Sequence, residues 1–255
     1  MSIQLSYSSD QRIATITIDR PAQRNSLTHE TLQMLQSAAV ELAAAPRCRV
    51  VILTGSGDQT FCAGAALDQL ASGELTSEQY ADAMDVIAAI GQPTIALLNG
   101  NAYGGGAELA LCCDFRLSSE SFHIRIPPAK LGLCYPPRGL ARYIGRLGNS
   151  ATRQLFLSAE PFNADSLLRL GFLTQIVAPD QLNERAIELA QHLAELSPQA
   201  LRTMKQICND FECPSEQQLH HAQMLADYCN QGYDFREGLS ATREKRAAKF
   251  ADNRE

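Results

Sequence analysis

The sequence predicts an α/β fold in which strands and helices alternate over residues 1–195, followed by a helical region over residues 196–255. Two observations carry this prediction. Short apolar runs at residues 50–54 and 94–98 each end at a glycine-containing turn, which is typical of buried strands. Apolar residues between the strands recur at helical spacing, so the chain is predicted to form stacked strand-strand-helix units joined by crossovers.

The N-terminal segment predicts two strands at residues 3–7 and 13–18, because their side chains alternate between polar and apolar. A turn at residues 8–11 joins them. Thr28 is predicted to cap the next helix, since a threonine oxygen can accept a hydrogen bond from the first helical turn. The apolar positions of that helix follow at intervals of three or four residues: Leu32, Leu35, Ala39 and Leu42.

The later elements follow from the same patterns, with residues 127–138 predicted as a loop. The predicted strands after the first helix are 50–54, 94–98, 115–117 and 173–177. The predicted helices are 80–90, 107–113, 140–144, 151–157, 164–170, 182–196, 199–209, 215–228 and 233–250. From Leu182 onward the pattern is helical only.

Composition excludes several classes of protein. The chain has 255 residues, 45% hydrophobic and 20% charged, as in soluble globular proteins. Its net charge of -6 argues against a nucleic-acid surface. The first residues lack the basic and apolar regions of a signal peptide, and no uncharged apolar run is long enough to cross a bilayer. We therefore expect a cytoplasmic protein that binds neither nucleic acid nor membrane.

Eight cysteines occur without any CxxC pair, so we expect reduced thiols and no structural metal. A dinucleotide-binding fold is also disfavoured. The turn after residues 50–54 reads Gly55-Ser56-Gly57, but Thr60 stands where the third glycine of G-x-G-x-x-G would fall.

The most informative stretch is residues 95–114, where an apolar strand leads into Gly104, Gly105 and Gly106 and then into an apolar helix. Glycines at a helix start leave the first N–H groups free to face an anion and let a ligand approach the backbone. Glu108 lies in this apolar helix, where burying a carboxylate is costly. It is either an acid/base or a first-turn charge set against the helix dipole, and the residues of this stretch leave both interpretations open.

A second stretch of similar kind follows residues 50–54. There, Phe61-Cys62-Ala63-Gly64-Ala65-Ala66-Leu67 again places small residues after a strand. Two such elements could each supply one backbone N–H to a single carbonyl oxygen.

Together these stretches resemble the paired signatures of the crotonase, or enoyl-CoA hydratase/isomerase, superfamily. Further similarity lies in four segments, at residues 19–27 (DRPAQRNSL), 127–132 (PPAKLG), 236–239 (REGL) and 244–246 (EKR). The resemblance implies a crotonase-like spiral of strand-strand-helix repeats with a C-terminal helical trimerisation region, assembled as a homotrimer or a hexamer of two trimers. It also implies an acyl-CoA thioester as substrate and no separate cofactor.

The resemblance assigns the N–H groups of Ala65 and Gly105 as donors to the thioester oxygen, on which enolate charge develops. It assigns Glu108 as the first of two glutamates with which family hydratases activate water. Pro128 stands in place of the second glutamate and cannot titrate, which argues against hydration by the two-glutamate route. We therefore expect an oxyanion hole with a single carboxylate.

Several reactions remain open for such a site. Glu108 could move a proton between carbons as a double bond migrates, or could activate water alone. The site could instead stabilise the enolate left by decarboxylation of a 2-carboxyacyl-CoA. A different class of alternative is a non-catalytic homologue kept for CoA binding or assembly.

The resemblance also predicts residues that contact the substrate. Many relatives carry aspartate at Ala66, where decarboxylase-like relatives can carry histidine. Decarboxylase-like relatives place a tyrosine at the position of Tyr135, although a tyrosine that only packs in the pocket wall fits the sequence as well. The predicted substrate-binding residues are Arg24, Ala63, Ala66, Leu67, Pro128 and Tyr135.

Coenzyme A carries phosphates, for which arginine is well suited. Arg24 is the predicted phosphate contact, with Arg20, Lys245 and Lys249 as further candidates. The remaining polar residues near these motifs are expected to be structural or on the surface: His123, Arg125, His220 and His221.

Overall fold

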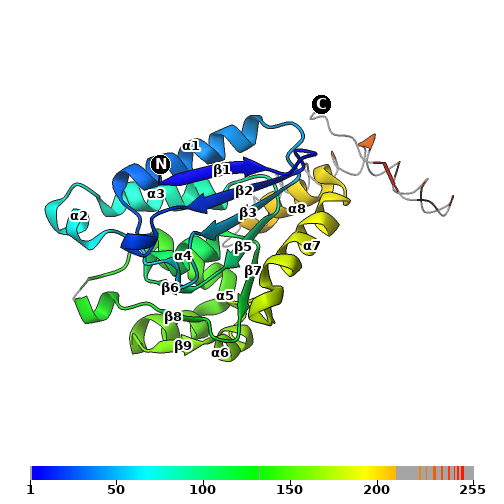
Figure 1. Cartoon of the computed structure of the whole chain (residues 1–255). Coiled ribbons are helices and arrows are strands. Elements are labelled where there is room, and N and C mark those ends of the chain that lie inside the picture. The colour runs from blue at the N-terminus through cyan, green and yellow to red at the C-terminus, as the bar shows by residue number, and fades with distance from the viewer. Residues whose placement is uncertain are drawn as a thin grey trace.

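Two β-sheets with helices packed around them form the fold in a computed structural model (Figure 1). The structure describes residues 2–131 and 133–210, and ten single positions between 224 and 249. The larger sheet has the strand order β1-β2-β3-β5-β7-β10, and the smaller one has the order β4-β6-β8-β9. The strands are β1 (Ile3–Tyr7), β2 (Ile13–Ile18), β3 (Val50–Gly55), β4 (Thr60–Cys62), β5 (Thr94–Leu98), β6 (Asn101–Tyr103), β7 (Phe115–Ser119), β8 (His123–Arg125), β9 (Pro161–Asn163) and β10 (Gln175–Val177).

All pairings within the larger sheet are parallel except that of β1 with β2. Helix α7 (Leu182–Ala194) covers one face, where its apolar side chains pack on β3, β5 and β7. Helices α1 (His29–Ala44), α3 (Ser77–Ala88) and α4 (Gly105–Cys112) belong to the cluster on the other face. Because both faces are covered, β3 and β5 are apolar along most of their length, as the sequence predicted.

The other helices are α2 (Leu67–Ser72), α5 (Pro137–Ser158), α6 (Ala164–Arg169) and α8 (Pro198–Asp210). The predicted cap of α1 is confirmed, since the Thr28 side chain accepts a hydrogen bond from the Thr31 N–H. The two helices predicted at 140–144 and 151–157 are confirmed as the two parts of α5, which a non-helical backbone conformation at Gly148, with φ of 80°, separates. Helix α2 was not predicted, because its six residues carry too little periodicity.

Some strand predictions were also wrong. The predicted strand at 173–177 begins only at Gln175, because the N–H groups of Phe172 and Leu173 both donate to the Leu167 carbonyl after α6. The loop predicted over 127–138 contains a 3-10 helix at Pro128–Leu131 and the start of α5. Strands β4, β6 and β9, with three residues each, were missed because they are too short to show alternation.

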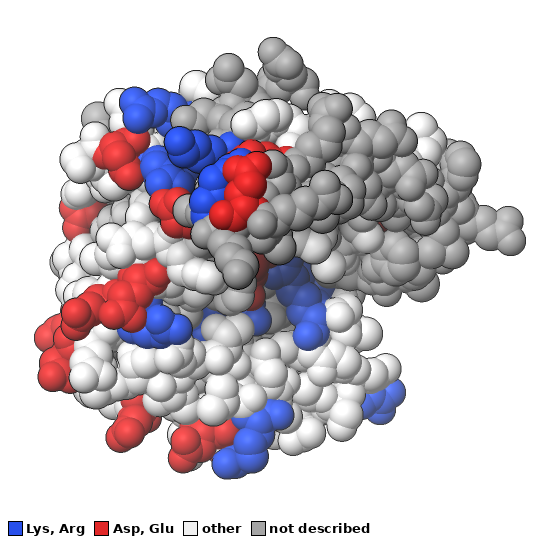
Figure 2. All heavy atoms as spheres, turned by 90° about the vertical axis from the view of Figure 1, so that its right-hand side faces the viewer, with Lys and Arg blue, Asp and Glu red and all other residues white. Residues whose placement is uncertain are grey.

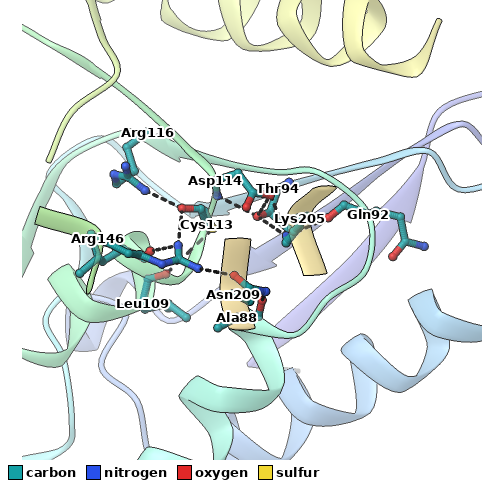
Figure 3. Close-up of polar contacts among 11 residues, drawn as sticks. Ala88, Gln92, Thr94, Leu109, Cys113, Asp114, Arg116, Arg146, Lys205 and Asn209 are labelled. Atoms are coloured by element: carbon teal, nitrogen blue, oxygen red, sulfur yellow. Dashed lines mark hydrogen bonds and ion pairs between the residues drawn. The ribbon is translucent and has the colours of Figure 1, made fainter. Parts of the chain in front are cut away.

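Helix α8 is fixed to the core by polar contacts that Figure 3 shows. The Lys205 ammonium donates to Asp114 Oδ2 at 2.7 Å, to Thr94 Oγ1 at 3.2 Å and to the Gln92 carbonyl at 3.0 Å. Beside it, Arg146 donates to the carbonyls of Leu111 and Cys113 at the end of α4. The Arg146 guanidinium opposes the negative end of the α4 dipole and so stabilises the helix that carries Glu108.

On the face that α7 and α8 form, basic and acidic side chains are interspersed over the described part of the surface (Figure 2). No helix in the described part of the chain is long and apolar enough to span a membrane. The described cysteines form no disulfide, and four of them are buried: Cys48, Cys62, Cys112 and Cys113. The predicted helices 215–228 and 233–250 lie largely outside the described residues, as do Lys245, His220 and His221.

Candidate active site

An apolar pocket of about 140 Å³ lies between the segment after β4, the start of α4 and the segment before α5. Six of the predicted site residues are among its lining residues: Ala63, Ala65, Leu67, Gly105, Pro128 and Tyr135. Chain segments separated by up to about seventy residues therefore meet at one cavity. The lining residues not predicted from sequence are Leu70, Ser77, Tyr80, Tyr103, Gly104, Pro127, Leu133 and Pro136.

Glycines bring the two predicted donor elements together. Gly64 has φ of +84°, and a Cβ added there would lie 2.8 Å from the Gly105 nitrogen. Gly106 lies against β4, where a Cβ would come within 2.1 Å of the Cys62 carbonyl oxygen. Any side chain at either position would push the 63–65 segment away from the start of α4, so these two glycines permit the close approach.

The backbone N–H groups of Ala65 and Gly105 donate no hydrogen bond to any described residue. Their neighbours are occupied: the Ala63 N–H donates to the Arg24 carbonyl, and the Ala66 N–H donates to the Leu27 carbonyl. On the other side, the Tyr80 hydroxyl donates to the Gly105 carbonyl at 2.8 Å and holds this peptide in place. Two unused donors thus lie at one pocket, one of them at a helix N-terminus, which favours an acceptor that carries negative charge.

Glu108 is 1% exposed and is not among the pocket-lining residues. Its Oε2 accepts a hydrogen bond of 2.6 Å from the Tyr135 hydroxyl, and its Oε1 accepts one from Arg142. Burial raises the pKa of the Glu108 carboxyl above its ordinary value, while the Tyr135 hydrogen bond and the Arg142 charge act against this rise. Tyr135, which does line the pocket, therefore lies between the cavity and the carboxylate.

Arg142 is the main site residue that sequence reasoning missed. It is 7% exposed and pairs with both Glu108 and Asp85 of α3. The sequence feature that could have identified Arg142 is its spacing from Gly139. The two residues lie three positions apart on α5, and therefore on the same helix face, shortly after Tyr135. Gly139 is needed there because a Cβ would lie 2.7 Å from the Tyr135 ring and 3.0 Å from Glu108 Oε1.

The other predicted residues lie outside the pocket lining. Ala66 is buried and precedes α2, while Arg24 is exposed and joined to Ala63 through its carbonyl. The Arg24 side chain makes no hydrogen bond or ion pair with the described residues, whereas Arg20 donates to the Ser26 carbonyl. His123 contacts the Tyr103 hydroxyl at 3.3 Å.

Comparison with known proteins shows the family of this chain. Residues 8–253 match the family model described as Enoyl-CoA hydratase/isomerase. A crotonyl-CoA hydratase of Syntrophomonas wolfei subsp. wolfei is 30% identical over 251 residues, covering 94% of this chain and 95% of the relative. A carnitinyl-CoA dehydratase of Salmonella typhi is 32% identical over 256 residues, covering 97% and 98%.

The fold comparison gives the same result. The crystal structure of an enoyl-CoA hydratase from Bacillus anthracis superimposes with a TM-score of 0.89 at 28% identity, covering 99% of this chain and 100% of that one. The predicted crotonase-like α/β fold is thereby confirmed. With a family match that spans nearly the whole chain, this protein belongs to the enoyl-CoA hydratase/isomerase family and is an enzyme of that type.

Proposed function

We propose that this enzyme converts an acyl-CoA thioester through an enolate, which the N–H groups of Ala65 and Gly105 stabilise while Glu108 serves as the only carboxylate acid/base. The observation that carries this proposal is that both N–H groups adjoin one pocket and donate to no described residue. Each well-placed donor to a developing oxyanion is worth about 3 to 4 kcal/mol in comparable sites. The substrate brings its own CoA group, so no further cofactor is needed.

Isomerisation of an enoyl-CoA fits this site better than hydration. Pro128 contributes a wall without a titratable group at the position of the second family glutamate. One carboxylate suffices to take a proton from one carbon and return it to another, whereas hydration requires a base for water and an acid for the α-carbon. The wall of Pro127, Pro128, Leu133 and Pro136 is apolar, which suits an acyl chain.

Decarboxylation of a 2-carboxyacyl-CoA is the second candidate. The described pocket-lining residues carry no charge, so a substrate carboxylate held there would lose its hydration without gaining a counter-ion. Breaking the bond to the carboxylate releases carbon dioxide and leaves the electron pair on the α-carbon, as an enolate on the thioester oxygen. The same N–H groups would stabilise that charge, and a proton delivered to the α-carbon would complete the reaction.

The proposal includes a CoA contact and an assembly. Arg24 is exposed beside the pocket with its side chain unpaired among the described residues, so it is available to a CoA phosphate. We also infer cytoplasmic localisation and a homotrimer or a hexamer of two trimers, on the strength of the family resemblance. Light scattering coupled to size-exclusion chromatography measures the assembly directly.

Mass spectrometry of 2-enoyl-, 3-enoyl- and 2-carboxyacyl-CoA incubated in heavy water tests the reaction. We expect either isomerised and deuterated product, which should be abolished in Glu108→Gln, or loss of carbon dioxide, which needs no base and should persist in that variant. The control is Glu41→Gln, which removes a carboxylate that pairs with Tyr7 at the exposed edge of the sheet. Addition of water to the 2-enoyl-CoA, lost in Glu108→Gln, would instead mean that one glutamate suffices for hydration.

A further inference from the structure

We propose that Tyr135, rather than Glu108, is the group that exchanges a proton with the substrate, and that Glu108 and Arg142 act through it. This inference rests on the proposed enolate chemistry and specifies the route of its proton. It concerns three residues that α4, α5 and the segment between them bring into one hydrogen-bonded chain.

The first argument is access. Both oxygens of Glu108 are occupied on the protein side, Oε2 by the Tyr135 hydroxyl and Oε1 by Arg142. The backbone at Gly139 closes a third side, because a Cβ there would lie within 3.1 Å of both oxygens. Tyr135 is the member of this group that lines the pocket. A substrate in the pocket therefore meets the phenol before it can meet the carboxylate.

The second argument is rigidity. The Tyr135 ring packs edge-on against Phe156 at 4.9 Å between centroids, and Phe156 packs in the same way on Tyr143. Arg142 is anchored on its far side by Asp85, which also pairs with Arg138. Swinging Tyr135 aside to expose Glu108 would break the hydrogen bond and these contacts in a close-packed interior.

The third argument is that the chain can carry a proton in both directions. As the substrate α-carbon loses its proton to the Tyr135 oxygen, the phenol proton passes to Glu108, and the electron pair remains on the substrate as the thioester enolate. The reverse transfer returns a proton to the enolate at the α- or the γ-carbon. Because the two transfers are concerted, the phenol never becomes charged, which matters since burial raises the pKa of Tyr135 above its ordinary value.

The charge on Glu108 is set by groups from three elements. Arg142 of α5 favours the carboxylate, while Asp85 of α3 and burial disfavour it. The other titratable neighbours, which burial keeps neutral, are Tyr80, Tyr143 and Cys112. Arg142 is thus a positioning residue that also holds Glu108 ready to accept the proton.

The test is deuterium exchange at the α-carbon of a saturated acyl-CoA in heavy water, followed by mass spectrometry. We expect Tyr135→Phe and Glu108→Gln each to slow exchange by about 10²-fold or more, the usual contribution of a positioned acid/base. The double variant should be no slower than the slower single variant, because residues that act as one unit are not additive. The matched control pair, Tyr7→Phe and Glu41→Gln, removes a tyrosine–glutamate hydrogen bond elsewhere and should leave exchange unchanged.

Exchange that persists in Tyr135→Phe but is lost in Glu108→Gln would overturn the inference and leave direct catalysis by Glu108. A wild type without exchange or turnover on the whole panel would instead refute the proposed function, and the inference with it. Affinity for the acyl-CoA, measured by calorimetry, should be unchanged within about threefold in Tyr135→Phe, which separates catalysis from binding.

Arg142 has its own readout. Arg142→Gln should move the acidic limb of the rate–pH profile to higher pH, because the charge that favours the Glu108 carboxylate is removed. Arg142→Lys keeps the charge and should return the limb toward its original position. A uniform fall in rate at every pH in both variants would mean that Arg142 only supports the fold.

Discussion

Gly139→Ala tests how tightly the site is built without removing any functional group. The added Cβ would lie 2.7 Å from the Tyr135 ring and about 3 Å from both Glu108 oxygens. Ordinary contacts begin near 3.4 Å, so the ring must retreat by about 0.7 Å. Phe156 packs against this ring and opposes the shift. Misplacement of a reacting group by about 1 Å can cost about 10²-fold in rate. We therefore expect turnover to fall by about 10- to 100-fold.

The stability of this variant should change much less than its activity. Alanine favours the helix by about 1 kcal/mol over glycine, whereas overpacking costs about 1–3 kcal/mol. The net loss of at most about 2 kcal/mol corresponds to a fall in Tm of less than about 8 °C for a chain of this size. Steady-state kinetics and calorimetry measure both quantities. The control is Gly91→Ala, where an added Cβ meets nothing within 4 Å. Turnover within threefold of wild type in Gly139→Ala would refute the claim that the positions of Tyr135 and Glu108 are critical.

Three further predictions follow. Ala65→Pro removes a backbone N–H and should lower kcat by about 10²- to 10³-fold. Ala65→Gly keeps this donor and should keep much of the rate. Equal activity of the two variants would exclude an oxyanion role for the Ala65 N–H. Arg24→Ala should weaken the binding of CoA, as measured by calorimetry. The control Arg153→Ala removes the same charge from an exposed site on α5 and should leave CoA affinity unchanged. Unchanged affinity in Arg24→Ala would contradict a phosphate contact. The pKa of Glu108 is raised in the folded protein, so its proton is bound more tightly there than in the unfolded chain, for which 4.5 is the reference value. The resulting stabilisation is fully present below that value and is lost as pH rises through the folded pKa. Denaturation measured across this pH range should therefore show that the free energy of unfolding of wild type falls relative to that of Glu108→Gln as pH rises. A difference that rises with pH would instead show that the Arg142 charge outweighs burial in setting the pKa of Glu108.

Four strands of the larger sheet could be predicted because they are long enough to show a pattern. The predictions for β1, β2 and β5 match the structure residue for residue, and β3 extends one residue further than predicted. The smaller sheet escaped prediction, since β4 and β6 have only three residues and owe their conformation to pairing with each other. Such pairing is a long-range interaction that no local window of sequence contains.

The glycine-rich stretches show how much of the site is local. Gly104, Gly105 and Gly106 marked the start of α4 because the chain there needs a positive φ at Gly104 and a close approach at Gly106. The assignment of Ala65 as the second donor and of Pro128 in place of a titratable residue came instead from the family resemblance. The glycine positions depend on backbone conformation, which the residue type indicates locally.

The sequence by itself therefore determined the α/β class, and its resemblance to the family predicted the two backbone donors and a single carboxylate, Glu108. Only the tertiary structure decided where that carboxylate points. Glu108 meets Tyr135 and Arg142, which lie 27 and 34 residues further along the chain, because α5 packs across α4 with Gly139 at the contact. The packing of the helices decides which side chains lie close enough to pair with a buried charge. That packing depends on the shapes of side chains far apart in sequence.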